Sequence, residues 1–265
     1  MFAKEKIEES KLQFSNNWKY FASKCPQPEC FETENLSFAW GNVNNIFFNA
    51  IFVLTIPKTR TEVKFLIKSI KNFTGDKSLP WWLIICNDSI SSIKNLNLQQ
   101  LLADNGFKEL MKLTGMATDC IAYPTNSNHF LKCKPIKNLE DRKSLSKINA
   151  ISYEILPAQF QTPLETEEFW EERVFGTIGY IENKPVSSAI ILWIENKFYL
   201  AFVATLPEYR QKGYAKIVIR HCLTQAEKKY GKCRMILHAT SMGASVYEKL
   251  GYKPTAYFST YTSYF

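Results

Sequence analysis

The stretch Val203-Ala-Thr-Leu-Pro-Glu-Tyr-Arg-Gln-Lys-Gly-Tyr-Ala215 decides the fold, because it has the composition of a β-strand that passes through a short loop into a helix. Val203 favours a strand, Pro207 ends it, and Gly213 permits a close backbone approach that a larger side chain would block. The first amides of a helix lack acceptors within the helix, and the helix dipole favours negative charge beside them. The stretch therefore predicts an anion-binding loop, although a tight turn that needs small residues only for packing would have the same sequence.

The sequence after the loop predicts a helix and then a strand. Apolar residues recur at the spacing of one buried helix face. These residues are Ala215, Val218, Ile219, Cys222, Leu223 and Ala226. Lys212, Lys216 and Arg220 lie four residues apart and form a basic stripe on the other side of the helix. A strand is expected at 234–240, followed by the segment Ser245-Val-Tyr-Glu-Lys-Leu-Gly-Tyr252.

The loop and this later segment together resemble the signature of the GNAT superfamily, the GCN5-related, acyl-CoA-dependent N-acyltransferases. In that family an Arg/Gln-x-x-Gly-x-Gly/Ala loop is followed by a Tyr-x-x-x-Gly-Phe/Tyr segment. Here the corresponding residues are Arg210, Gly213 and Ala215 in the loop, and Tyr247 and Gly251 in the segment. The resemblance covers about residues 130–265. It implies an α/β (α+β) fold with a mixed, mostly antiparallel sheet flanked by helices.

The order of elements in the second half agrees with this fold. Strands are expected at 130–137, 174–182, 188–195 and 198–205, and helices at 140–156 and 165–173. The connections at 183–185 and 196–197 are expected to be short hairpin turns.

The first half predicts a second domain, so that the chain divides into 1–128 and 129–265. The segment Leu101-Leu-Ala-Asp-Asn-Gly-Phe107 aligns with 246–252 glycine to glycine, with Leu102 in the place of Tyr247. Apolar segments at 46–56 and 81–86, with a helical pattern at 62–72 between them, agree with a related α/β unit. We therefore expect a tandem arrangement whose first copy has lost the phosphate loop and the hydroxyl. The alternative is an unrelated α/β domain.

Charge and composition limit the classes of partner. The chain has a net charge of +8, and residues 129–265 contribute 19 Lys and Arg against 13 Asp and Glu. An electropositive domain attracts a polyphosphate ligand such as coenzyme A. The basic stripe would meet the ribose phosphate of that ligand, or would form an ordinary solvated helix face. No dense basic run or RNA-binding signature points to nucleic acid.

The seven cysteines are odd in number and scattered, at positions 25, 30, 86, 120, 133, 222 and 233. This distribution indicates a cytoplasmic protein without a disulfide framework. Cys25 and Cys30 lack a second pair with ligand spacing, so we expect no metal. No apolar run has the ~20 residues of a membrane span, and the charged N-terminal segment is unlike a secretory signal.

The resemblance implies that an amine attacks the thioester of acetyl-CoA directly, in a ternary complex. It assigns Tyr247 the protonation of the leaving thiolate, because a phenol of pKa about 10 keeps its proton at neutral pH. The alternative for Tyr247 is a packing aromatic on an amphipathic helix. The resemblance assigns the cofactor contacts to the strand end and the loop, at Val203, Ala204, Thr205, Arg210, Gln211, Lys212, Gly213, Tyr214, Ala215 and Lys216. Arg210 is expected either to touch a phosphate or to brace the turn.

The acceptor and the general base are less defined. The acidic segment 165–172, with two aromatic residues, would suit a cationic amine or would be a solvated acidic helix. His238, Glu195 and Glu208 are base candidates, with a structural role the expected one for His238.

Three functions agree with these patterns. They are an acyl-CoA:amine N-acyltransferase, a catalytically silent acyl-CoA-binding regulatory or interaction module, and a scaffold whose aromatic tail at 257–265 forms an exposed patch. For that tail, a sheet edge is the alternative.

Overall fold

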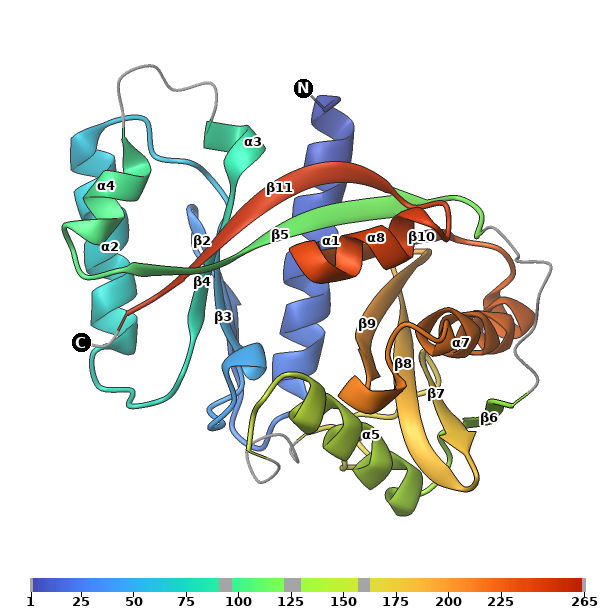
Figure 1. Cartoon of the computed structure of the whole chain (residues 1–265). Coiled ribbons are helices and arrows are strands. Elements are labelled where there is room, and N and C mark those ends of the chain that lie inside the picture. The colour runs from blue at the N-terminus through green and yellow to red at the C-terminus, as the bar shows by residue number, and fades with distance from the viewer. Residues whose placement is uncertain (1, 91–96, 122–129, 157–162, 264–265) are drawn as a thin grey trace. The chain divides into compact units, whose positions relative to one another are not determined.

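The computed structural model describes residues 2–90, 97–121, 130–156 and 163–263 (Figure 1). The chain divides into two compact units. Unit 1 comprises Met1–Gly115, His238–Met242 and Pro254–Phe265, and unit 2 comprises Met116–Leu237 and Gly243–Lys253. The predicted boundary between residues 128 and 129 lies outside the described residues and stays a prediction.

Unit 1 contains a sheet with strand order β1-β2-β3-β4-β11-β5. Strands β1, β2 and β3 form antiparallel pairs, β3 and β4 are parallel, and β11 is antiparallel to β4. Its elements are α1 (Lys4–Ser23), β1 (Glu29–Glu32), β2 (Leu36–Trp40), η1 (Ile46–Phe48), β3 (Asn49–Val53), α2 (Arg60–Thr74), β4 (Trp82–Cys86), α3 (Asn87–Ile90), α4 (Leu98–Ala103), β5 (Lys108–Thr118) and β11 (Lys253–Thr262).

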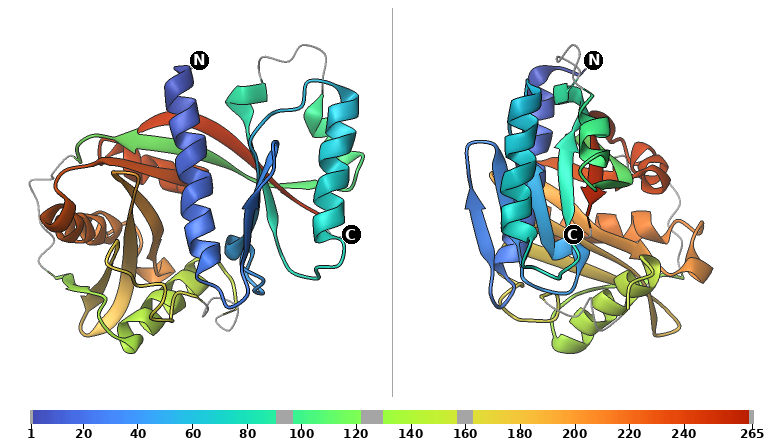
Figure 2. Two further views of the ribbon diagram at one scale, coloured as in Figure 1. Left: turned by 180° about the vertical axis from the view of Figure 1, so that it is seen from behind. Right: turned by 90° about the vertical axis from the view of Figure 1, so that its left-hand side faces the viewer.

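Helices α1 and α2 cover the two faces of the unit 1 sheet (Figure 2). Ile51 of β3 and Leu83 of β4 pack with the apolar side of α2, whereas Phe52 and Ile84 pack with Phe14 of α1. Successive residues of a strand point to opposite faces, so a strand between two helices is apolar at every position. This explains the largely apolar segments at 46–56 and 81–86.

The aromatic tail is an interior strand of unit 1. Strand β11 lies between β4 and β5, with Phe258 opposite Cys86 and Tyr261 opposite Leu83. Both aromatic rings are buried, and only Tyr257 among the described aromatic residues of the tail is exposed. The expectation of an exposed patch or a sheet edge is therefore wrong, because pairing with a strand more than 160 residues earlier buries the tail.

Unit 2 has the strand order β10-β9-β8-β7-β6. Strands β6 to β9 are antiparallel, and β9 is parallel to β10. Its elements are β6 (Lys132–Pro135), α5 (Leu139–Ser152), β7 (Val174–Ile181), β8 (Lys184–Ile194), β9 (Lys197–Thr205), η2 (Pro207–Tyr209), α7 (Tyr214–Tyr230), β10 (Arg234–Thr240) and α8 (Ser241–Glu248). The last residues of β10 and the first of α8 are grouped with unit 1. The predicted mixed, mostly antiparallel sheet flanked by helices is confirmed.

Helices α5 and α7 cover opposite faces of the unit 2 sheet. Asn149 of α5 donates from Nδ2 to the Ser188 hydroxyl of β8, at 3.1 Å, and Ser188 is the register partner of Ile178 in β7. The neighbouring residue Thr177 contacts His221 of α7, with 3.2 Å between its hydroxyl and Nδ1. Adjacent strand residues point to opposite faces. The predicted apolar face of α7 is buried at Val218, Ile219, Cys222, Leu223 and Ala226, and Ala215 is half-buried.

Two local expectations are corrected. Residues 165–173 form successive turns and not a helix, with the Trp170 amide donating to the Glu167 carbonyl at 2.8 Å. The segment's carboxylates repel one another within a helix. The Trp170 indole also donates to the Leu164 carbonyl at 2.8 Å, which holds the turns in place.

The hairpin turns fall at 182–183 and 195–196, each beginning one residue earlier than expected. All four turn residues have φ between 47° and 68°, the backbone of a tight hairpin turn.

The aligned segments of the two halves have the same local backbone. The amides of Asn105, Gly106 and Phe107 donate to the carbonyls of residues 102, 103 and 102, at 3.0 to 3.1 Å. The amides of residues 250, 251 and 252 repeat this pattern toward 247, 248 and 247, at 2.9 to 3.1 Å. Gly106 has φ 87° and Gly251 has φ 94°, a region that favours glycine. Apart from the four-residue helix α3 between β4 and α4, the order strand, helix, strand, helix, strand also recurs, as β3-α2-β4-α4-β5 and β9-α7-β10-α8-β11.

Candidate active site

The corner between β9 and α7 presents a row of backbone donors. Gly213 is the N-cap of α7, with φ 80°, and no side chain caps the helix. The amides from Gln211 to Ala215 donate to no acceptor in the described part of the chain, whereas the amides of Lys216 and Ile217 return to the Gly213 carbonyl, at 3.1 and 3.4 Å. Gln211 also has a positive φ, 62°. These five amides lie at the positive end of a 17-residue helix, so the corner fits an anion such as a diphosphate.

Basic side chains lie around this loop. Lys212 Nζ donates to the Glu208 carbonyl at 3.2 Å, and the same ammonium lies 5.2 Å from the centre of the Tyr209 ring. Lys184 pairs with the Glu208 carboxylate at 3.2 Å. Of the residues in the predicted basic stripe, Lys216 and Arg220 belong to α7, whereas Lys212 precedes the Gly213 N-cap in the loop. The side chains around the donors thus add positive charge to the corner.

Strand β9 has an irregular carboxyl end. Its pairing with β8 contains a bulge, because Ser188 pairs with Ala204 while Ile190 pairs with Ala201, and Phe202 has φ 49°. Within the described part of unit 2, its parallel pairing with β10 extends from Lys197 to Tyr199. Val203, Ala204 and Thr205 therefore lie beyond the segment that pairs with β10.

Arg210 does not extend its guanidinium into the row of donors. Its Nε donates to the Thr205 carbonyl at 3.1 Å, its Nη2 donates to the Ser152 carbonyl at 3.2 Å, and its amide donates to the Pro207 carbonyl at 3.2 Å. Of the two roles expected for Arg210, the geometry favours the brace. Ser152 could not be found from the sequence, because the contact joins residues 58 positions apart and no pattern connects them.

Tyr247 lies on α8 among other phenols. Its ring centre is 5.9 Å from that of Tyr252. Its hydroxyl makes no hydrogen bond with the described residues, unlike the Tyr252 hydroxyl, which contacts the Met235 sulfur at 3.7 Å. Burial raises the pKa of the Tyr247 phenol, and the nearby Tyr153 phenol raises it further. Tyr247 thus keeps its proton at neutral pH, and its phenol O–H can donate a hydrogen bond or a proton.

The acidic segment 165–172 is mostly engaged in surface contacts. Glu167 pairs with Arg142 at 3.4 Å, and Glu172 pairs with Lys229 at 3.0 Å. Phe169 is fully buried, and the Trp170 indole is bonded to the backbone. These contacts favour an acidic surface segment that meets basic neighbours, the alternative to an acceptor groove.

The three base candidates have different surroundings. His238 belongs to unit 1, where its ring stacks on Phe14 at 3.8 Å between centres and its Nε2 lies 3.1 Å from the Ser10 hydroxyl. Burial lowers the pKa of His238 to about 3, so it is a neutral structural side chain. Glu208 is exposed and paired with Lys184. Glu195 lies in a hairpin turn.

The corresponding corner of unit 1 is closed. Thr55-Ile-Pro57 after β3 matches Thr205-Leu-Pro207 after β9, but side chains cap the helix that follows. The Glu62 amide donates to the Thr59 hydroxyl at 3.1 Å, and the Lys58 amide donates to Glu62 Oε2 at 2.7 Å. These two bonds occupy the amides of Lys58 and Glu62, which are donors at the start of the helix that an anion would need.

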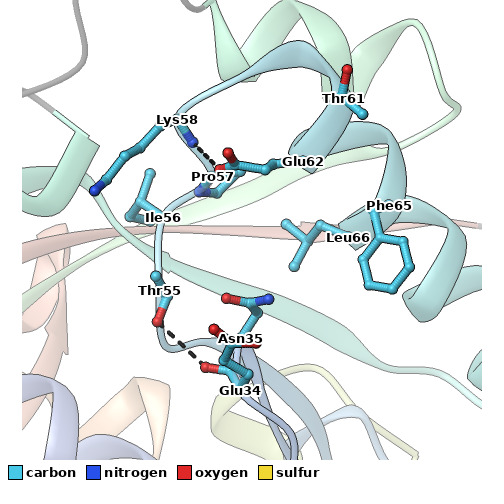
Figure 3. A pocket seen from close by; sticks show the side chains of 10 residues that line it. All are labelled: Glu34, Asn35, Thr55, Ile56, Pro57, Lys58, Thr61, Glu62, Phe65 and Leu66. Atoms are coloured by element: carbon cyan, nitrogen blue, oxygen red, sulfur yellow. Dashed lines mark hydrogen bonds between the residues drawn. The ribbon is translucent and has the colours of Figure 1, made fainter.

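A pocket of about 520 Å³ lies beside this capped corner (Figure 3). Its lining residues are Glu34, Asn35, Thr55, Ile56, Pro57, Lys58, Thr61, Glu62, Phe65 and Leu66. The Thr55 hydroxyl donates to the Glu34 carbonyl at 3.4 Å and connects two sides of the pocket (Figure 3).

A strand-loop-helix corner with uncapped amides, next to an irregular strand end in a mostly antiparallel sheet, defines unit 2 as a GNAT-type fold. Residues 145–252 match the model of the acetyltransferase (GNAT) family. No significantly similar sequence is found among curated proteins.

Solved structures share the fold. A GCN5-related N-acetyltransferase from Kribbella flavida is 16% identical, with a TM-score of 0.69, and the match covers 99% of this chain and 96% of that one. A functionally unknown conserved protein from Staphylococcus epidermidis is 12% identical, with a TM-score of 0.65 and coverage of 87% and 91%. A GCN5-related N-acetyltransferase from Sphaerobacter thermophilus is 12% identical, with a TM-score of 0.60 and coverage of 80% and 71%.

In the described part of the chain, no group of three or more His, Cys, Asp or Glu residues is arranged to hold a metal ion. Within the same residues, no helix combines the length and the apolar character needed to cross a bilayer. All seven cysteines are free thiols.

Proposed function

We propose that the chain is an N-acetyltransferase that transfers the acetyl group of acetyl-CoA to a primary amine, by direct attack in a ternary complex. The observation that carries the proposal is the row of five amides from Gln211 to Ala215 without acceptors among the described residues, at the start of α7. The match of 145–252 to the acetyltransferase family supports it.

The residues of unit 2 divide the work. The amides from Gln211 to Ala215 would hold the diphosphate of coenzyme A, with Lys212 and Lys216 adding positive charge. The β9 backbone at Val203, Ala204 and Thr205 would bind the pantetheine arm and orient the thioester. A donor from this strand end would also stabilise the negative charge that develops on the thioester oxygen.

Tyr247 would act as the general acid. The amine nitrogen forms a bond to the thioester carbon, and the carbon–sulfur bond breaks with its electron pair on sulfur. Tyr247 gives its phenol proton to that sulfur, and the resulting phenolate regains a proton from the amine nitrogen, which loses one as the amide forms. The raised pKa of the Tyr247 phenol keeps the donor protonated, and its hydroxyl makes no bond with the described residues that would have to break.

A catalytically silent acyl-CoA-binding module is the second candidate. It is favoured by the positions of the base candidates, because His238 is stacked in unit 1 and Glu208 is paired with Lys184. Release of free thiol from acetyl-CoA, measured against a panel of primary amines and peptides, separates the two functions. Amine-dependent release supports the enzyme, whereas saturable binding without release for any acceptor supports the silent module.

For the first half we propose a degenerate copy of the same unit. The shared hydrogen-bond pattern at 102–107 and 247–252, the recurring element order, and the matching Thr-Ile-Pro and Thr-Leu-Pro corners support this origin. The Thr59 and Glu62 cap occupies the donors of the first corner. One chain would therefore bind one acyl-CoA. The proposal includes a cytoplasmic location, with which the seven free thiols agree.

A further inference from the structure

The guanidinium of Arg210 joins two elements that are distant in sequence. It donates to the carbonyl of Thr205, the last residue of β9, at 3.1 Å, and to the carbonyl of Ser152, the last residue of α5, at 3.2 Å. The Ser152 hydroxyl donates to the same Thr205 carbonyl at 3.3 Å. Three hydrogen bonds thus connect the C-terminal turn of α5 with the end of β9. We call this set of contacts the Arg210 clamp.

The turn that the clamp holds has a strained backbone. Glu154 has φ 57°, in the left-handed region that disfavours residues with a side chain. The amides of Glu154 and Ile155 donate back to the carbonyls of Ile151 and Ala150, at 3.3 and 2.9 Å, as in a Schellman C-cap, where glycine is the usual residue. A turn closed by glutamate needs contacts from outside the helix to keep this conformation.

The clamp also reaches the candidate active site. The Thr205 carbonyl, which accepts two of the three bonds, belongs to the end of β9 that is proposed to bind the pantetheine arm. Tyr153 directly follows Ser152 and is the C-cap residue of α5.

We propose that Arg210 is a positioning residue, which holds the C-terminal turn of α5 against the end of β9 instead of binding a phosphate of coenzyme A. This role rests on the proposed acetyltransferase function. Two of the guanidinium nitrogens already donate to carbonyls, and the amide is bonded to Pro207. A phosphate contact by this side chain would have to compete with both bonds.

Substitution by lysine separates the two roles. Lysine keeps the positive charge but lacks the planar fork that reaches two carbonyls along fixed directions. If Arg210 attracted a phosphate, Arg210→Lys would preserve the affinity for acetyl-CoA. If Arg210 is a clamp, both Arg210→Lys and Arg210→Gln lose the link between α5 and β9. Lys212→Gln, in the same loop and without a contact to α5, is the matched control for a lost charge.

The kinetic test compares Arg210→Lys, Arg210→Gln and Lys212→Gln. We expect both Arg210 variants to keep the Kd for acetyl-CoA within about twofold, and to lower kcat/KM for the amine about 10-fold to 100-fold, the effect of a misplaced catalytic group. The role is overturned if Arg210→Gln weakens acetyl-CoA binding more than Lys212→Gln does and Arg210→Lys restores it.

A second measurement tests the clamp without activity or ligand. Hydrogen exchange at the amides of Tyr153, Glu154 and Ile155 should be faster in Arg210→Lys than in wild type, and unchanged in Lys212→Gln. Ser152→Ala, which removes one bond of the clamp, should give a smaller increase. Equal exchange in Arg210→Lys and wild type contradicts the clamp. If wild type binds no acetyl-CoA while exchange behaves as expected, the clamp stands and the proposed acetyltransferase function fails.

Discussion

Replacing Gly213 by alanine tests the row of donors with the smallest possible change. Gly213 has φ 80°, and a Cβ added there would meet no atom within 4 Å. Alanine therefore introduces no clash, and its whole effect comes from the left-handed backbone. That conformation costs an L-residue about 1–2 kcal/mol relative to glycine.

The magnitude for binding follows from this cost. If the amides must keep the left-handed geometry to hold the diphosphate, a relaxed Gly213→Ala variant loses about 1–2 kcal/mol of binding free energy, or about 5-fold to 30-fold in Kd, at 1.4 kcal/mol per tenfold. Gly213→Glu adds a carboxylate at the anion site, and we expect no measurable binding of acetyl-CoA.

Gly231, at the other end of α7, is the matched control. It has φ 74° and ψ −174°, and a Cβ there would also meet nothing within 4 Å. That backbone region is almost restricted to glycine, so Gly231→Ala loses at least as much stability. Both alanine variants should lower Tm by about 2–4 °C per kcal/mol, as for a chain of this size.

Calorimetry with acetyl-CoA on both alanine variants decides the outcome. We expect weaker binding in Gly213→Ala and unchanged binding in Gly231→Ala. Equal affinity in the two variants, or wild-type affinity in Gly213→Glu, refutes the assignment of the diphosphate to this loop.

Three further predictions concern other parts of the molecule. Tyr247→Phe should lower kcat about 10²-fold to 10⁴-fold and leave acetyl-CoA affinity unchanged, because only the acid is removed; Tyr252→Phe is the control, and an equal effect in both would demote Tyr247 to packing. His238, with its pKa lowered to about 3, is neutral in the folded protein, so its contribution to stability is complete above pH 6.5 and falls as the pH drops from 6.5 toward 3. In urea unfolding, the free energy of unfolding of His238→Gln should therefore decrease less than that of wild type over this pH range, and an equal decrease would contradict this. Removal of the unit 1 cap in the double variant Thr59→Ala/Glu62→Ala should lower stability by about 1–2 kcal/mol without changing acetyl-CoA affinity; weakened binding would contradict the division of roles between the two corners.

Elements with a strong local pattern could be predicted from the sequence. The strand at 234–240 has the expected bounds, and the apolar face of α7 is buried as expected apart from half-buried Ala215. Among the described residues, the loop before α7 has the expected unbonded amides at a helix start, because turn chemistry and helix periodicity are properties of neighbouring residues.

Features that depend on distant residues could not be predicted. The turns at 165–173 are held by the bond from the Trp170 indole and the burial of Phe169, which override a helical pattern. The tail from residue 257 is an interior strand because β4 pairs with it. The Arg210 clamp joins residues 58 positions apart, and no spacing in the sequence points to Ser152.

The capping of α2 is an intermediate case. Thr59 and Glu62 have the spacing of a capping box, a local signal that the sequence does contain. The sequence does not show its consequence for anion binding. The structure does, because the start of α2 is capped by side chains whereas the start of α7 has amide donors that are free within the described part of the chain.

The most direct test of the proposed function is a calorimetric titration of wild-type protein with acetyl-CoA, with acetyl-pantetheine, which lacks the diphosphate, as the comparison. The row of amides at 211–215 predicts one acetyl-CoA bound per chain, and no measurable binding of acetyl-pantetheine at the same concentrations. Absence of acetyl-CoA binding, or equal binding of the two compounds, would contradict the assignment of the diphosphate to the start of α7, and two molecules per chain would contradict the closed corner of unit 1.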